Sequence, residues 1–225
     1  MPKHGRRRQD HLARQARSEG YHARSIYKLE AIQRKFHILI KGSRVLDLGA
    51  APGSWTQYVV EQGGAGTSEA ARSATTVLAV DLQEMSVAGA TCVQGDFTEP
   101  DIVARITGSA PFDLIMSDAA PATTGNRLVD TGRSEALVES ILARLRDWLA
   151  PGGNLVCKLF QGGGEQDLLR QIREQFRAGH LYRPDAVRRE SFETYLVGIG
   201  YRADVNDQTA WTSDPNDRTT AEGEG

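Results

Sequence analysis

The sequence predicts an α/β domain in which a mostly parallel β-sheet carries helices on both faces. From Ser43 onward, short apolar runs alternate with amphipathic segments, as strand–helix units do in a parallel sheet. The first of these runs leads into a loop of small residues that is followed by a helix. The length of 225 residues fits one large domain, and we find no internal repeat. We therefore expect a single folded unit that holds the whole site.

The N-terminal segment is strongly basic. Residues 1–41 hold 11 Lys and Arg against 3 Asp and Glu, whereas the remainder holds 16 against 26. We interpret residues 1–20 as a flexible basic arm that is too polar to fold alone. Such an arm either contacts a polyanion, because each neutralised phosphate releases counterions, or is a solvated surface. The charge by itself does not separate these two interpretations.

The elements that follow are predicted by apolar spacing. Ile26, Leu29, Ile32 and Phe36 recur at helical spacing, which predicts a helix that docks on the body and carries Lys28. The expected strands are Val45–Leu48, Val77–Val80, Thr91–Val93, Phe112–Met116, Leu155–Phe160 and Tyr195–Ile199. The expected helices between them are Ser54–Glu61, Ser134–Leu149 and Gln166–Phe176. The domain then covers residues 21–203, with a mobile loop at 63–76 and a disordered polar tail at 204–225.

The small-residue loop, Gly49-Ala50-Ala51-Pro52-Gly53, follows the first strand. Ligands of open α/β sheets bind beyond the carboxyl ends of the strands, where small residues let them reach the backbone. The spacing differs from the G-x-G-x-x-G pattern that cradles a pyrophosphate, which disfavours a nicotinamide-dependent oxidoreductase. It favours a ligand built from adenosine and an amino-acid moiety.

Two carboxylates follow the next two strands. Asp81 is placed to accept hydrogen bonds from ribose hydroxyls, and Asp96 from an adenine amino group. Taken singly, each is more often a turn or cap residue. Their succession behind the small-residue loop favours the ligand-binding interpretation.

Three further charged residues lie at or near strand ends. Asp118 follows the strand Phe112–Met116, and Glu193 leads into the last strand. Lys158 interrupts an apolar run where a central strand should be apolar, and lysines are almost never buried unpaired. Each has an ordinary alternative: a turn or cap residue for Asp118, an exposed edge residue for Glu193, and a strand-end lysine that reaches water for Lys158.

Six motifs in order resemble the FtsJ family, bacterial heat-shock methyltransferases that modify a uridine ribose in large-subunit ribosomal RNA. The motifs lie at residues 24–29, 47–55, 94–97, 117–121, 158–162 and 193–195, and the likeness runs from about Gly20 to Arg202. The resemblance implies a Rossmann-like class I methyltransferase fold with seven strands, the last of them antiparallel. Ala119 and Ala122 depart from the Met and Asn common in the family, which bears on RNA contacts more than on chemistry.

The resemblance also assigns roles to individual residues. The S-adenosylmethionine contacts that it implies are Gly53, Trp55, Asp81, Asp96 and Asp118. The catalytic tetrad that it implies is Lys28, Asp118, Lys158 and Glu193, with Lys158 as the proton acceptor. Trp55 could equally be a core aromatic residue.

A lysine can accept a proton only in its uncharged form. Burial in a strand and the neighbouring cation Lys28 favour uncharged Lys158, whereas Asp118 and Glu193 favour its ammonium form. The residues alone leave this balance open.

We therefore expect S-adenosylmethionine-dependent 2′-O-methylation of a uridine ribose in 23S ribosomal RNA, in the assembled 50S subunit. We expect a monomer, and we expect it in the cytoplasm because no run approaches the roughly 20 apolar residues that span a bilayer. We expect no metal, because the histidines show no ligand spacing. Arg188 and Arg189 would add to the phosphate contacts of the basic arm. The alternatives are a ribose methyltransferase acting on transfer RNA or a messenger cap, and a non-catalytic ribosome-assembly factor.

Overall fold

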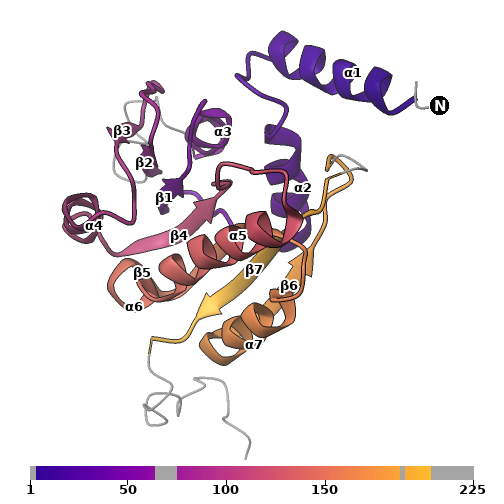
Figure 1. Cartoon of the computed structure of the whole chain (residues 1–225). Coiled ribbons are helices and arrows are strands. Elements are labelled where there is room, and N and C mark those ends of the chain that lie inside the picture. The colour runs from indigo at the N-terminus through magenta and orange to yellow at the C-terminus, as the bar shows by residue number, and fades with distance from the viewer. Residues whose placement is uncertain (1–3, 64–74, 188–190, 204–225) are drawn as a thin grey trace, which may run out of the picture.

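The fold is built around a seven-stranded sheet with helices on both faces (Figure 1). The computed structural model describes residues 4–63, 75–187 and 191–203. The expectations for residues 64–74, for Arg188 and Arg189 and for the tail from residue 204 therefore lie outside the described residues. No helix within the described ranges is long and apolar enough to cross a membrane.

The sheet has the order β3-β2-β1-β4-β5-β7-β6. Its strands are β1 (Arg44–Leu48), β2 (Thr76–Asp81), β3 (Thr91–Gln94), β4 (Phe112–Ser117), β5 (Leu149–Phe160), β6 (Phe176–Tyr182) and β7 (Glu193–Tyr201). The first five strands pair in parallel, and β7 runs antiparallel between β5 and β6. The predicted fold class and its antiparallel last strand are confirmed. The six strands predicted from apolar runs are all present, whereas β6 was missed.

The described helices are α1 (His4–Ser18), α2 (Ile26–Phe36), α3 (Ser54–Gln62), α4 (Pro100–Thr107), α5 (Arg127–Leu142), α6 (Leu145–Trp148) and α7 (Glu165–Gln175). Apolar side chains of α4 to α7 pack with one face of the sheet, and those of α1 to α3 pack with the other. Successive residues of a strand point to opposite faces of the sheet. Leu155 and Cys157 pack with α4 to α7, whereas Val156 between them packs with α1 to α3. This two-layer core holds the carboxyl ends of β1 to β5 at one edge.

Helix α5 begins seven residues before the expected start at Ser134. The Asn126 side chain accepts hydrogen bonds from the backbone N–H groups of Leu128 and Val129, so it caps the helix N-terminus. The prediction missed this first turn because Leu128 and Val129 are exposed and break the apolar spacing. A break after Leu142 then separates α5 from α6, which were expected as one helix.

The expectation of a flexible N-terminal arm is wrong for residues 4–18, because these residues form the helix α1. Ala16 is fully buried and belongs to the same core cluster as α2 and α3. Just beyond the helix, Glu19 accepts a 2.8 Å hydrogen bond from the Tyr27 hydroxyl. The Tyr21 hydroxyl donates to Glu61 of α3 at 2.8 Å. Tertiary contacts at its C-terminal end thus support a helix that its own composition does not predict.

Candidate active site

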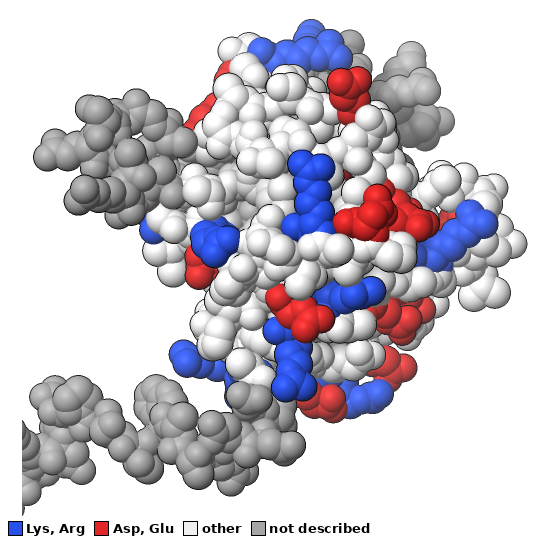
Figure 2. Space-filling view, turned by 90° about the vertical axis from the view of Figure 1, so that its left-hand side faces the viewer, with Lys and Arg blue, Asp and Glu red and all other residues white. Residues whose placement is uncertain are grey.

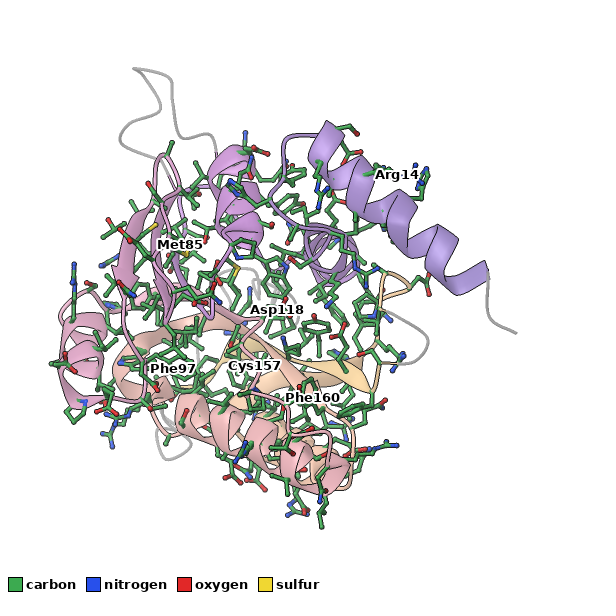
Figure 3. All side chains as sticks on the ribbon, turned by 45° about the horizontal axis from the view of Figure 1, so that its top comes forward. Arg14, Met85, Phe97, Asp118, Cys157 and Phe160 are labelled. Atoms are coloured by element: carbon green, nitrogen blue, oxygen red, sulfur yellow. The ribbon has the colours of Figure 1, made fainter. Side chains whose placement is uncertain are left out.

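A cleft of about 590 Å³ opens at the carboxyl ends of the central strands. Figure 3 shows Asp118 at the middle of this edge, between the region of Met85 and Phe97 and that of Phe160. The lining residues come from four loops and from α5: Gly49, Ala51, Asp81, Leu82, Gln83, Gly95, Asp96, Phe97, Thr98, Asp118, Ala119, Ala120, Pro121, Ala122, Arg133, Ala136 and Leu137. The position at the switch in strand order between β1 and β4 is where open α/β sheets bind ligands.

Gly49 is required where the loop after β1 meets the loop after β4. Its φ of 72° is in the left-handed region, and a Cβ added there would lie 2.5 Å from the Cα of Ala119. Only glycine permits both the conformation and the contact. Its N–H donates to the carbonyl oxygen of Val80, which ties the loop to β2.

The structure places both predicted carboxylates in the cleft. Asp81 accepts hydrogen bonds from the N–H groups of Ala51 and Gln83, at 2.9 and 2.8 Å. Asp96 accepts from the N–H and the hydroxyl of Thr98, at 2.8 and 2.7 Å. Asp81 and Asp96 therefore both stabilise turns, as the ordinary interpretation expected. Both also line the cleft, as a ligand contact requires. Cofactor binding by these residues stays a prediction.

Gly53 and Trp55 are not among the residues that line the cleft. Trp55 is 2% exposed, its indole N–H donates to the carbonyl oxygen of Ser25, and its ring centroid lies 5.9 Å from that of Tyr195. Gly53 is the N-cap residue just before α3, with a φ of 105°, and a Cβ there would lie 2.6 Å from Cγ2 of Val87. Both residues therefore pack behind the residues that line the cleft, and cofactor binding by either stays a prediction.

The four residues of the expected tetrad come together as two ion pairs. Nζ of Lys28, on α2, lies 2.6 Å from Oε1 of Glu193 at the start of β7. Nζ of Lys158, on β5, lies 3.4 Å from Oδ1 of Asp118 and also donates to the backbone oxygen of Asp118. The four side chains are between 9% and 20% exposed. Asp118 belongs both to this cluster and to the lining of the cleft, so the two sites are continuous.

Tyr195 is a fifth member of the cluster that the sequence analysis left unassigned. It lies opposite Lys158 in the β5–β7 register, and its hydroxyl donates to Oδ1 of Asp118 at 2.8 Å. Burial raises the pKa of this phenol well above its usual value, and the charges of Asp118 and Glu193 add to the effect. Side chains two residues apart in a strand point to the same face of the sheet. The sequence could therefore have predicted that Tyr195 lies on the same face as Glu193.

Asp47 is a buried carboxylate behind the cleft. It is 1% exposed, and its Oδ2 accepts a 2.6 Å hydrogen bond from the hydroxyl of Thr56, while Oδ1 has no hydrogen-bond partner. Burial, reinforced by the charges of Asp118 and Asp81, raises its pKa to about 7. The group therefore keeps its proton at pH values where an exposed aspartate is ionised.

The cluster can hold a hydroxyl group between amines and carboxylates. Such an arrangement suits proton removal from a weakly acidic nucleophile next to a bound electrophile. Within the described ranges, no group of three or more His, Cys, Asp or Glu could hold a metal ion.

Known proteins are similar to this chain in sequence and in fold. The family model described as FtsJ-like methyltransferase matches residues 21–201. The ribosomal RNA large subunit methyltransferase E of Treponema pallidum is 46% identical over 200 residues, which cover 87% of this chain and 96% of that protein. A solved Plasmodium falciparum structure, named a ribosomal RNA methyltransferase, is 25% identical with a TM-score of 0.69, over 80% of this chain and 98% of its own.

A more distant structure supports the fold alone. Human methyltransferase-like protein 13, solved in complex with SAH, is 17% identical with a TM-score of 0.52, over 78% of this chain and 80% of its own. The matched family covers every strand of the sheet and all four members of the tetrad. The chain belongs to the FtsJ-like methyltransferase family, and it is a methyltransferase with a Rossmann-like fold.

Proposed function

We propose that the protein transfers a methyl group from S-adenosylmethionine to the 2′-hydroxyl of a uridine ribose in 23S ribosomal RNA. The observation that carries this proposal is the double role of Asp118, which lines the cleft and binds Lys158. A methyl donor in the cleft and a hydroxyl at the tetrad would then be neighbours. Such proximity is the first requirement of an in-line displacement.

The cleft residues fit the cofactor. Small side chains at Gly49, Ala51 and Gly95 leave the backbone accessible, and Asp81 and Asp96 offer carboxylates to hydroxyl and amino groups. Phe97 and the exposed Leu82 supply apolar surface for an aromatic base. When bound, the cofactor supplies an electrophilic methyl group on a positively charged sulfur.

The tetrad would activate and hold the ribose. Lys158 accepts the proton of the 2′-hydroxyl, and Asp118 fixes the position of Lys158 through its backbone oxygen and its carboxylate. Tyr195 in turn holds the Asp118 carboxylate. The Lys28–Glu193 pair provides a donor and an acceptor that position the ribose hydroxyls.

The names of the relatives and the charge of α1 support ribosomal RNA as the substrate. Two relatives described above are named as ribosomal RNA methyltransferases. Figure 2 shows acidic and basic side chains mixed over the face that carries α4 and β3, with basic side chains at the end where Figure 1 places α1. We propose that α1 contacts phosphates of the assembled 50S subunit and that the enzyme acts as a cytoplasmic monomer.

The test is methyl transfer from radiolabelled S-adenosylmethionine to 50S subunits taken from cells that lack the enzyme. Mass spectrometry of the 23S RNA should locate one new methyl group on the ribose of a uridine. Methylation of a base or of transfer RNA would contradict the proposal. Binding to subunits without any transfer would favour a non-catalytic assembly factor.

A further inference from the structure

Three residues at the start of α5 and just before β7 are what we call the mouth patch: Arg127 and Leu128, which are exposed, and Phe192, which is partly exposed. Leu128 is 80% exposed, and Val129 next to it is 40% exposed. Within the described ranges the other large apolar side chains with such exposure are Ile40 and Leu82, and Leu82 lines the cofactor cleft. A helix that begins with two exposed apolar side chains at the border of an active site indicates a contact surface.

The aromatic member of the patch is attached directly to the tetrad. Phe192 is partly exposed and immediately precedes Glu193, whose carboxylate binds Lys28. Its ring packs on that of Phe160, with centroids 4.7 Å apart. The guanidinium carbon of Arg127 lies 5.2 Å from the centroid of the Phe192 ring. The ring is thus held in place from two elements.

The cationic member is also fixed. Nη2 of Arg127 donates to the backbone oxygen of Gln161 at 3.2 Å, just beyond the end of β5. Arg127 is exposed, and it brings a planar cation next to an aromatic ring. Planar cations and aromatic rings both stack on nucleic-acid bases, and the positive charge suits a phosphate backbone.

An RNA strand bound at the tetrad would pass over the mouth patch. If a ribose lies at the tetrad, the nucleotides on either side of it must cross the surrounding surface. One border of the tetrad is taken by the loop Asp118–Ala122, which lines the cofactor cleft. Phe192 lies at another side of the tetrad, next to Glu193, and neither Phe192 nor Arg127, which contacts its ring, lines that cleft.

We propose that the mouth patch stacks the base of a nucleotide adjacent to the methylated ribose, so that it acts as the RNA-positioning surface of the enzyme. The proposal rests on the RNA ribose methylation proposed above. The occupant is single-stranded RNA, since a base paired within a helix does not expose its face. An apolar surface of a protein partner is the other possible occupant, and the test separates the two.

The test compares Phe192→Leu, which keeps an apolar side chain, with Phe192→Trp, which keeps an aromatic face. Leu128→Ser removes the exposed apolar contact, and Ile40→Ser is a matched control at an apolar side chain that is 66% exposed near the amino end of β1. Kinetics with 50S subunits should show a KM about tenfold higher for Phe192→Leu, the size expected for one stacked base. Phe192→Trp should recover most of the loss, and Leu128→Ser should raise KM more than Ile40→Ser.

Two further readouts make the result specific. S-adenosylmethionine affinity should be the same in all four variants, because none of these residues lines the cofactor cleft. The indole introduced by Phe192→Trp should lose fluorescence when protein-free RNA that contains the target segment is added, relative to the wild type.

Three outcomes would overturn the inference: an unchanged KM in Phe192→Leu, an equal loss in Phe192→Leu and Phe192→Trp, or a parallel loss of cofactor affinity. The first outcome would indicate an apolar protein surface on the patch, because leucine offers such a surface an apolar contact as phenylalanine does. The failure of the proposed function would look different, because the wild type itself would then transfer no methyl group to 50S subunits.

Discussion

Nζ of Lys158 contacts Asp118 twice, through the backbone oxygen and at 3.4 Å through Oδ1. Tyr195 donates to the same Oδ1. The position of the amine is therefore fixed by a residue that also borders the cleft in which we propose the cofactor binds. Changes at Lys158 should affect proton transfer while leaving cofactor binding intact.

We predict that Lys158→Met and Lys158→Arg both lower methyl transfer by about 10²- to 10⁴-fold, the usual contribution of a general base. Met keeps the apolar stem, whereas Arg places a permanent charge beside Asp118 and cannot give up its proton. Single-turnover transfer and calorimetric S-adenosylmethionine binding, measured side by side, check this. Substantial turnover by Lys158→Arg would rule out the general-base assignment, and lost cofactor binding would make the residue structural.

We predict that Asp81→Asn weakens S-adenosylmethionine binding by at least about tenfold, since hydrogen bonds to a charged group contribute about 1.5–3 kcal/mol. The substitution removes the charge of a carboxylate that lines the cleft and accepts from Ala51. Glu84→Gln is the matched control, because Glu84 is exposed in the same loop but does not line the cleft. Equal cofactor affinities of the two variants would contradict the assignment.

We predict that Asp47→Asn changes how stability depends on pH. The pKa of Asp47 is raised from 3.8 to about 7 in the folded state. Between about pH 4 and pH 7 the unfolded chain therefore loses this proton while the folded chain keeps it, and the free energy of unfolding falls as pH rises. Above pH 7 this contribution is constant.

The Asn variant has no such proton to lose. Its free energy of unfolding should rise relative to the wild type by a few kcal/mol between pH 4 and pH 8, since one pKa unit corresponds to about 1.4 kcal/mol. Urea denaturation at several pH values measures the difference. Glu139→Gln, at an exposed position of α5, is the matched control for the loss of a carboxylate. A difference between Asp47→Asn and the wild type that is independent of pH would show that Asp47 is ionised in the folded state.

We predict that replacing Arg6, Arg7 and Arg8 with Gln makes RNA binding weaker and less dependent on salt. Each lost phosphate contact should lower the slope of log K against log salt by about 0.7–0.9. Filter binding at several salt concentrations gives this slope. Arg105→Gln, on α4 at the opposite side of the molecule from α1, is the control (Figure 1). If the triple variant and the control have the same slope as the wild type, α1 does not contact phosphates.

Local patterns were sufficient for the central strands and for α2, because their residues face the core at regular spacing. Strand β6 was missed because it lies at the sheet edge. Among its seven residues only Phe176 and Gly179 are buried, which leaves little alternation to detect. Helix α1 was missed because its support comes from Tyr27 and from the burial of Ala16, which depend on the folded body.

The residues of the candidate site could be singled out from the sequence, but the contacts between them could not. Asp118, Lys158 and Glu193 each stood out as charges at the end of, or within, apolar strands. Their pairing was not readable from spacing, since Lys28 and Glu193 are joined only when α2 packs near β7. The role of Tyr195 likewise needs the β5–β7 register, which no local pattern encodes.

The anchoring of α1 has a consequence for substrate selection. Because Ala16 is buried and Glu19 is bonded to Tyr27 of α2, the C-terminal end of the helix is held next to α2, which also carries Lys28. Phosphates bound along α1 would then lie at a set distance and direction from the ribose held by Lys28. Such an enzyme measures the three-dimensional spacing between two RNA segments, and a folded RNA would meet that requirement where a short linear oligonucleotide would not.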